Sequence, residues 1–337
     1  MVQEDYLKKL FGLYPWIILS IILIFILFNS FYQIFSSTYI GEPGKTVYIP
    51  PKASLKYVGD LLEKEGIVKS SFHFRVYLFL IGKHKSVKAG YYNFKGTLRL
   101  KDVVNQLVKG GEGITITFPE GLTLLEIQDI LNKNGLKVNL TKYKLKDFNN
   151  IDLIKYFPEE ASLEGFLAPD TYQFFKEETE KEIISKFLKN FSKKFLQEFL
   201  KRPESNFYQK LILASILERE AKTPEDMALV AGILEKRLAK DKKLEVDATI
   251  AYIKCKSYPC NWDVKKSDLK IESPYNTYLN NGYPPTPISN PGLNAIRASL
   301  NPVASDFWYY LSNKNGEVIF SKTLKEHQKN IKKYLKY

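Results

Sequence analysis

The chain has 337 residues, of which 45% are hydrophobic and 26% are charged. This length and composition fit two or three modest domains with buried cores, and they exclude a disordered chain. The three histidines are scattered, and the sequence contains no H-E-x-x-H, G-x-G-x-x-G or Walker A motif, so we expect no metal site and no cofactor.

The N-terminal segment has no charged residue from position 10 to position 41. Residues 10–35 have the length that a helix needs to cross a bilayer, and aromatic residues lie at both ends. We therefore predict a short cytoplasmic tail over residues 1–9, a single transmembrane helix over 10–35, and the remainder outside the cell (inner) membrane. The alternative is a cleaved signal peptide, but this stretch is longer than a signal h-region and no A-x-A-like site follows it.

The formal net charge of +13 is compatible with nucleic acid, an anionic lipid surface or an anionic polymer outside the cell as a partner. A membrane anchor argues against nucleic acid, and no basic-aromatic motif of nucleic-acid binders is present. A solvated surface is the simplest explanation, because lysine and glutamate are mixed along most of the expected helices.

An internal repeat follows the predicted anchor. Residues 47–67 and 116–136 each read as a short strand, a proline turn and a helix. The helix-capping serine or threonine and the helix-ending glycine correspond in the two copies: Ser54 with Thr123, and Gly66 with Gly135. Such units resemble the LysM-like modules of cell-wall proteins. We predict a first small α/β segment over 42–112 and a LysM-like segment with a connector over 113–160.

The remaining residues, 161–337, predict a mixed α/β domain, which makes the fold class α+β. Helical periodicity is present over 180–200, 208–221 and 223–239, followed by a loop over 273–292, a hairpin over 307–321 and a basic tail helix over 324–337.

One carboxylate in this domain is in a position to act as a general acid. Glu218 directly follows the apolar run 211–217, and a carboxyl group at the end of such a run can be desolvated, which raises its pKa. Two alternatives remain open at this point: Glu218 forms an i,i+4 surface pair with Lys222, or Glu220 is the important acid.

Two further segments combine polar side chains with turn residues. Residues 163–174 read LEGFLAPDTYQF, which indicates either a ligand site or a rigid corner. Residues 273–292 read SPYNTYLNNGYPPTPISNPG, whose aromatic faces and amides suit carbohydrate. A long structured loop is the alternative there. Between these segments, Cys255 and Cys260 form a local disulfide if the domain lies beyond the membrane, or remain thiols in a reducing compartment.

The motifs ASILERE, LEGFLAPDTY, VDAT and SPYNTY with PPTPISNPG, in this order, together resemble the endolytic murein lytic transglycosylases, the YceG-like family of bacterial cell-wall enzymes. The resemblance implies that Glu218 is the catalytic glutamate. The substrate-binding residues that it and the surrounding motifs indicate are Glu164, Asp170, Tyr172, Gln173, Asp247, Thr249, Tyr275, Asn276, Thr277, Tyr278 and Asn290. The sequence departs from the family pattern at Val246, Ala248, Ala168 and Thr286, which puts fine substrate contacts in doubt but not the acid.

The resemblance also implies the chemistry. One glutamate protonates the bond between N-acetylmuramic acid and N-acetylglucosamine, and its carboxylate then deprotonates the muramyl C6 hydroxyl to close a 1,6-anhydro ring. Implied partners are nascent glycan strands and the synthases that polymerise them, with no nucleic acid. The alternatives are a hydrolytic muramidase with a second acid such as Asp247, and a non-catalytic wall-binding protein.

Overall fold

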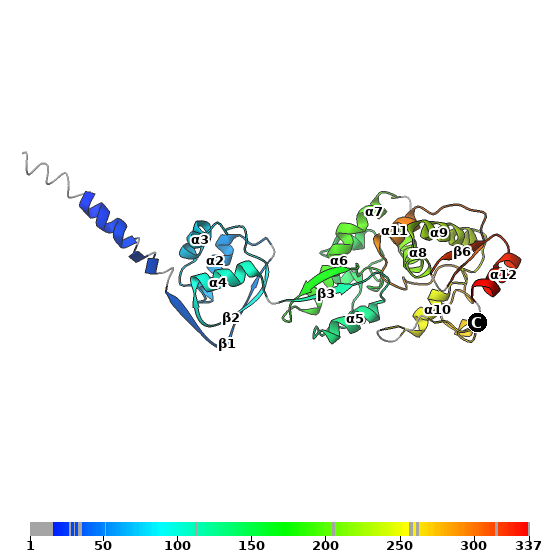
Figure 1. Ribbon diagram of the computed structural model, residues 1–337, viewed down its shortest axis with the longest axis horizontal. Coiled ribbons are helices and arrows are strands. Elements are labelled where there is room, and N and C mark those ends of the chain that lie inside the picture. Colours follow the sequence, from blue (N-terminus) through cyan, green and yellow to red (C-terminus); the bar gives the residue numbers. More distant parts are fainter. Residues whose placement is uncertain are drawn as a thin grey trace, which may run out of the picture. The chain divides into compact units, whose positions relative to one another are not determined.

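A computed structural model of the chain describes residues 16–26, 28–29, 31–32, 36–50, 52–111, 113–203, 206–255, 259–260, 263–313 and 316–335. It divides into two compact units, Met1–Ile114 and Thr115–Tyr337, which are described separately below (Figure 1).

The predicted membrane anchor falls only in part on described residues. Residues 16–26, 28–29 and 31–32 are helical, whereas the predicted tail 1–9 and positions 10–15, 27, 30 and 33–35 lie outside the described residues. Within the part that the structure describes, no helix is both long enough and apolar enough to cross a membrane. The transmembrane helix over 10–35 therefore stays a prediction.

The first unit packs three helices against a two-stranded antiparallel sheet. The sheet pairs β1 (Ser37–Ile49) with β2 (Gly90–Arg99), and its register shifts between Ile40 and Lys45. The helices are α2 (Leu55–Lys64), α3 (Ser71–Leu80) and α4 (Leu100–Lys109). The fully buried side chains at the centre of this unit include Val58, Leu62, Phe74, Leu78, Phe94 and Leu107. A small α/β segment in this region is what the sequence predicts.

The two predicted copies of the repeat both form, and each is capped as expected. The Ser54 hydroxyl accepts the backbone N–H of Tyr57 at the start of α2. The second copy consists of β3 (Ile114–Phe118) and α5 (Leu124–Lys133), and Thr123 caps α5 in a reciprocal box with Glu126. Gly66 and Gly135 follow the helices with positive φ.

The structure divides after Ile114, close to the predicted boundary after residue 112, and the second copy of the repeat lies in the second unit. Strand β3 pairs with β4 (Asp170–Phe174), which lies beyond the predicted connector. From Thr115 onward the segment predicted as a separate LysM-like module is therefore part of the larger unit. Single-turn helices at Leu140–Lys142, Leu145–Phe148 and Asp152–Lys155 fill the connector.

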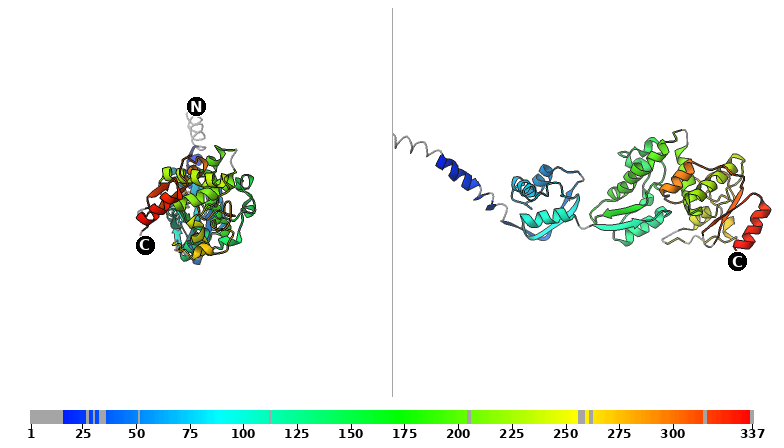
Figure 2. Two further views of the ribbon diagram at one scale, coloured as in Figure 1. Left: turned by 90° about the vertical axis from the view of Figure 1, so that its right-hand side faces the viewer. Right: turned by 45° about the horizontal axis from the view of Figure 1, so that its top comes forward.

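The second unit is mainly helical (Figures 1 and 2). Its helices are α6 (Glu180–Lys194), α7 (Leu196–Leu200), α8 (Phe207–Glu220), α9 (Pro224–Ala239), α10 (Asp247–Lys254), α11 (Leu293–Leu300) and α12 (Leu324–Tyr334), with a single turn at Asp268–Lys270. Strands β5 (Tyr309–Ser312) and β6 (Val318–Ser321) form the predicted hairpin. The predicted helix 180–200 is interrupted at Phe195, where α6 ends and α7 begins.

Helix α8 is the central helix of this unit. Every residue from 211 to 217 is buried, and α8 contacts α9, α10 and α11. Ser215 fastens the C-terminal end of the 273–292 loop to it, because its Oγ accepts the Ile288 N–H at 3.0 Å and its carbonyl accepts the Ser289 hydroxyl at 2.9 Å. These contacts bring the loop that ends at Gly292 to the last turn of α8.

Candidate active site

Glu218 lies in the last turn of α8, directly after the buried run, and is itself half-buried. Its Oε2 accepts a hydrogen bond of 2.9 Å from the backbone N–H of Gly292. Among the described residues, the structure gives no hydrogen-bond partner to the other carboxyl oxygen. One oxygen is thus fixed and the other is available to exchange a proton with a ligand.

The surroundings of Glu218 raise its pKa to about 7. Burial is the main cause, and the negative charge of Glu120 adds to it, whereas the Gly292 N–H and the charge of Arg219 oppose it. A carboxyl group with this pKa populates both its protonated and its ionised form near neutral pH. It can therefore serve first as an acid and then as a base.

Glu120 is a second carboxylate beside Glu218, and two glycines allow its approach. A Cβ atom at Gly292 would overlap the Glu120 carboxylate, so only glycine leaves room for that side chain where it lies. Gly121 has φ +80°, and a Cβ there would lie 3.5 Å from Cγ of Glu218 and 3.1 Å from Nη1 of Arg219. Three segments distant in sequence thus meet at Glu218. Sequence reasoning missed Glu120 because its proline turn was explained by the repeat.

Two buried polar residues hold these segments together. Glu164 accepts the Leu124 N–H at 2.9 Å and the Asn290 amide at 3.1 Å. Asn290 also accepts the Leu167 N–H and donates to the Leu122 carbonyl, at 2.8 and 2.9 Å. Burial raises the pKa of Glu164 to about 8. The exposed fraction is 3% for Glu164 and 1% for Asn290, so these predicted substrate-binding side chains instead position the turn that bears Glu120.

Three more predicted substrate-binding residues are also buried and bonded within the protein. The Asn276 amide donates to two backbone carbonyls, at Leu269 and Ile271. The Thr277 hydroxyl accepts the N–H of Val246 and lies 3.0 Å from the Thr249 hydroxyl. These side chains are at most 2% exposed, which places them in the fastening of the long loop to α10 rather than on a surface that a glycan could reach.

Asp247 and Tyr278 form a second polar cluster with Glu220, the last residue of α8. The Tyr278 hydroxyl donates to Oδ1 of Asp247 at 2.6 Å. Glu220, two residues after Glu218, has its pKa raised to about 7, mainly by burial and also by the charge of Asp247, while hydrogen bonds from Tyr310 and the Ala248 backbone oppose the shift. Asp247 is exposed and Tyr278 is half-buried, so both are within reach of a ligand.

Tyr275 lines a pocket of about 270 Å³ in the second unit. Its ring lies 5.1 Å from the ring of Tyr252, and its hydroxyl lies 2.8 Å from that of Thr286. The other residues that line this pocket are Thr123, Leu125, Ile253, Cys255 and Ser273.

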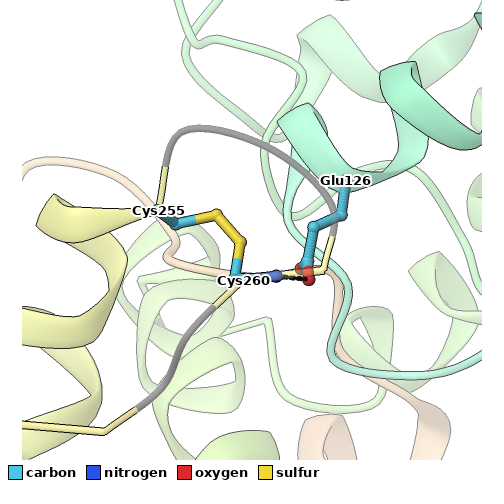
Figure 3. A group of neighbouring side chains, drawn as sticks. All are labelled: Glu126, Cys255 and Cys260. Carbon is cyan, nitrogen blue, oxygen red and sulfur yellow. Dashed lines mark hydrogen bonds between the residues drawn. A yellow bond between two sulfur atoms is a disulfide. The ribbon is translucent and has the colours of Figure 1, made fainter.

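Cys255 and Cys260 are joined in a disulfide beside this pocket, which is the first of the two alternatives left open by the sequence (Figure 3). The backbone N–H of Cys260 donates to Glu126 at 3.0 Å, so the bridged loop is attached to the start of α5. Within the described part of the chain, Glu126, Cys255 and Cys260 are the group whose donor atoms gather closely enough to hold a metal. Their two sulfurs are bonded to each other, and a disulfide is not a thiolate ligand pair.

Three predicted site residues lie on β4 and are tied to α6. Asp170 accepts from Asn190 and from Lys194, at 2.8 and 2.6 Å, and Asn190 also donates to the buried Tyr172. The side chain of Gln173 is exposed. Among the residues that the structure describes, none of the three side chains forms a hydrogen bond with Glu218 or Gly292.

The proposed surface pair between Glu218 and Lys222 does not form in the described structure. The Lys222 ammonium lies instead against Gly316, which follows the β5 strand. In the short connection between α8 and α9, Thr223 caps α9 ahead of Pro224.

The comparisons with known proteins agree with one another. The sequence profile of the YceG-like family matches residues 47–333. An endolytic murein transglycosylase of Bacillus subtilis (strain 168) is 32% identical over 308 residues, covering 86% of this chain and 84% of the relative. One of Streptococcus pneumoniae (strain D39) is 30% identical over 325 residues, covering 86% of this chain and 58% of the relative. The 2.6 Å crystal structure of a putative YceG-like protein from Listeria monocytogenes is 31% identical, with a TM-score of 0.53, covering 85% of this chain and 98% of that one. Because the match spans most of the sequence and both units, this chain belongs to the YceG-like family.

Proposed function

We propose that this chain is an endolytic murein transglycosylase, a lyase that cleaves the bond between N-acetylmuramic acid and N-acetylglucosamine within glycan strands. The observation that carries the proposal is Glu218 itself, half-buried, held by Gly292 and with a pKa of about 7. Two relatives that match over 86% of this chain have that activity in their names.

In the proposed reaction Glu218 acts twice. Its protonated form donates the proton to the glycosidic oxygen while the bond from that oxygen to C1 of the muramic acid breaks. The Gly292 N–H is placed to stabilise the carboxylate that forms. That carboxylate then takes the proton of the C6 hydroxyl, whose oxygen bonds to C1 of the same sugar and closes the 1,6-anhydro ring. The nucleophile belongs to the substrate, which gives it a high effective concentration and makes an attacking water unnecessary.

A hydrolytic muramidase is the second candidate, and Glu120 is the observation that favours it. Glycoside hydrolases act with a pair of carboxylates, and Glu120 and Glu218 provide such a pair. The products distinguish the two reactions, because hydrolysis adds one water and leaves a reducing muramic acid, whereas the lyase reaction leaves an anhydro end.

Mass spectrometry of muropeptides released from purified sacculi tests this assignment. We expect anhydro ends from the wild-type protein and from Glu225→Gln, an exposed control on α9. Reducing ends alone would replace the lyase by a muramidase. Sacculus binding without any released product would favour the non-catalytic wall-binding protein.

We also propose that residues 10–35 anchor the protein in the cell (inner) membrane, with the N-terminus in the cytoplasm and the residues after position 35 outside. The uncharged stretch from position 10 to position 41 supports this, as do the helical residues within it. The enzyme would then act on nascent strands close to the synthases that produce them. N-terminal sequencing of the mature protein checks the anchor, since a chain beginning near Gly41 would show that a signal peptidase had removed it.

A further inference from the structure

Helix α3 has an apolar surface on the side that faces away from the core of the first unit. Phe74 and Leu78 point into that core, where both are fully buried. Phe72, Phe79 and Leu80 are 58%, 71% and 72% exposed. A helix that is apolar on every side is normally buried, so we expect another molecule or a membrane to cover this outer face.

The outer face has helical spacing and a hollow between its side chains. Positions 72, 76, 79 and 80 recur at intervals of three and four residues, which places them on one stripe. They border a hollow of about 340 Å³ in which Arg75 is the one charged lining residue. Contiguous exposed apolar surface of this kind marks a contact with a protein or a membrane.

The segment that contains α3 is basic and favours an anionic partner. From position 66 to position 88 the sequence has five lysine or arginine residues and no aspartate or glutamate. Two carboxylates of α2, Asp60 and Glu63, accept hydrogen bonds from Ser71 at the start of α3. Basic side chains beside exposed aromatic and aliphatic ones are typical of helices that lie in the interface of an anionic bilayer. Self-association through this face would bring two basic segments of the same sign close together, with Arg75 at the hollow of each copy, which disfavours a second copy as the occupant.

Helix α3 also begins beside the end of the apolar N-terminal segment. The Lys69 ammonium, one residue before the α3 cap, lies 5.3 Å from the ring centroid of Tyr32. Strand β1 begins at Ser37, so the sheet of the first unit starts within about 18 Å of Tyr32 even if the intervening chain is fully extended.

We propose that the outer face of α3 docks on the same bilayer that holds the N-terminal segment, with Phe72, Phe79 and Leu80 among the acyl chains and the neighbouring basic side chains at anionic headgroups. The inference rests on the anchor proposed above and is independent of the catalytic assignment. In this arrangement the folded part of the first unit lies against the membrane surface and is not held away from it.

Spin labelling of the full chain in lipid vesicles tests the contact. One label is placed at Phe79→Cys, and a matched control at Tyr57→Cys on α2, where the side chain is 50% exposed. The native cysteines are joined in their disulfide, so each label reports one position. Vesicles contain either one third phosphatidylglycerol or phosphatidylcholine alone, and accessibility to oxygen is compared with accessibility to a water-soluble nickel chelate.

In vesicles with phosphatidylglycerol, we expect the ratio of oxygen accessibility to nickel-chelate accessibility to be several-fold higher at position 79 than at position 57. At position 79 this ratio should be smaller in phosphatidylcholine alone. It should also be smaller in the variant that carries both Lys83→Glu and Lys85→Glu. A label at 79 that reads as aqueous in both lipids would overturn the proposal. Protection from both reagents would overturn it in favour of a protein partner, and equal immersion in both lipids would overturn the role of the basic residues. An alkaline wash of the same vesicles, made after the spectra are recorded at neutral pH, tests the anchor separately. A chain that the wash removes from the vesicles has no membrane anchor, whereas the spectra report only the contact between α3 and the bilayer.

Discussion

At the scale of single residues, the acid strength of Glu218 depends on a balance that the surrounding residues set. Burial and the charge of Glu120 disfavour the carboxylate, and the Gly292 N–H and Arg219 favour it. The result is a pKa of about 7, which suits a group that must be protonated when the glycosidic bond breaks and ionised immediately afterwards.

The pH dependence of cleavage follows from this balance. We expect kcat/KM on isolated glycan to fall as the pH rises through about 7, because Glu218 loses the proton that it donates. In Glu120→Gln the fall should begin at a lower pH, since one of the influences that raise the Glu218 pKa is gone. Glu120→Asp, which keeps the charge, is the matched control and should shift less. An alkaline limb at the same pH in wild type and Glu120→Gln would show that Glu120 does not influence the acid.

Sequence reasoning could select Glu218 as the candidate acid but could not predict its neighbours. The apolar run before Glu218 is a local signal, and burial at its end follows directly from it. Glu120 and Gly292 are distant from Glu218 in the sequence and meet it only through the packing of loops. For the same reason Asn276, Thr277 and Thr249 read as polar residues of a binding loop, whereas the structure uses them to fasten that loop.

At the scale of elements, the site is the meeting of a turn, a loop end and a helix end. The turn after β3 carries Glu120 and is bound to Asn290, since the Gly121 N–H donates to the Asn290 carbonyl at 2.9 Å and the Asn290 N–H donates to the Leu122 carbonyl at 2.8 Å. Gly292 lies two residues after Asn290, and its N–H donates to Glu218. A displacement of the turn or of the loop end would therefore change the surroundings of the Glu218 carboxyl group.

Gly292→Ala tests this arrangement. Its φ of −82° suits alanine, and the atoms that a Cβ would meet belong to the flexible, exposed end of Glu120, so we expect little loss of folding stability. Glu120 should be pushed aside, and the alkaline limb of kcat/KM should move to lower pH as in Glu120→Gln. The double variant should shift no further than either single one. Additive shifts would mean that the two residues act on Glu218 separately.

The repeat illustrates what patterning within an element can predict. Both N-caps and both glycine ends were predictable because each depends on a few adjacent residues. The pairing of β3 with β4, which joins the start of the predicted 113–160 segment to the domain predicted from 161 onward, was not predictable in this way because the two strands are far apart in sequence. The interruption of the helix at Phe195 likewise has no proline or glycine to indicate it.

At the scale of the whole molecule, one buried and two half-buried carboxyl groups make the stability of the second unit depend on pH. Glu164 has a pKa of about 8 in the fold, against an ordinary value of 4.5, and Glu218 and Glu220 reach about 7. Unfolding therefore releases protons over this range. The stabilisation is complete below about pH 4.5 and is lost as the pH rises towards 8.

Glu164→Gln should reduce that loss. Glutamine has no proton to release, so the free energy of unfolding should decrease less between pH 4.5 and 8, and the remaining decrease should end near pH 7. Denaturant unfolding at a series of pH values measures this slope, whatever offset the substitution itself adds. Glu225→Gln, an exposed change on α9, should leave the slope unaltered. An unaltered slope in Glu164→Gln would mean that Glu164 does not hold a proton in the fold.

The central claim is that Glu218 is the single acid and base, and Glu218→Gln tests it most directly. Glutamine keeps an oxygen for the Gly292 N–H but cannot transfer a proton, so release of anhydro-muropeptides from sacculi should fall by roughly 100- to 10,000-fold with folding and sacculus binding retained. Glu220→Gln, the rival carboxylate two residues on, should lose far less. Wild-type cleavage by Glu218→Gln, or its loss in Glu220→Gln alone, would contradict the account.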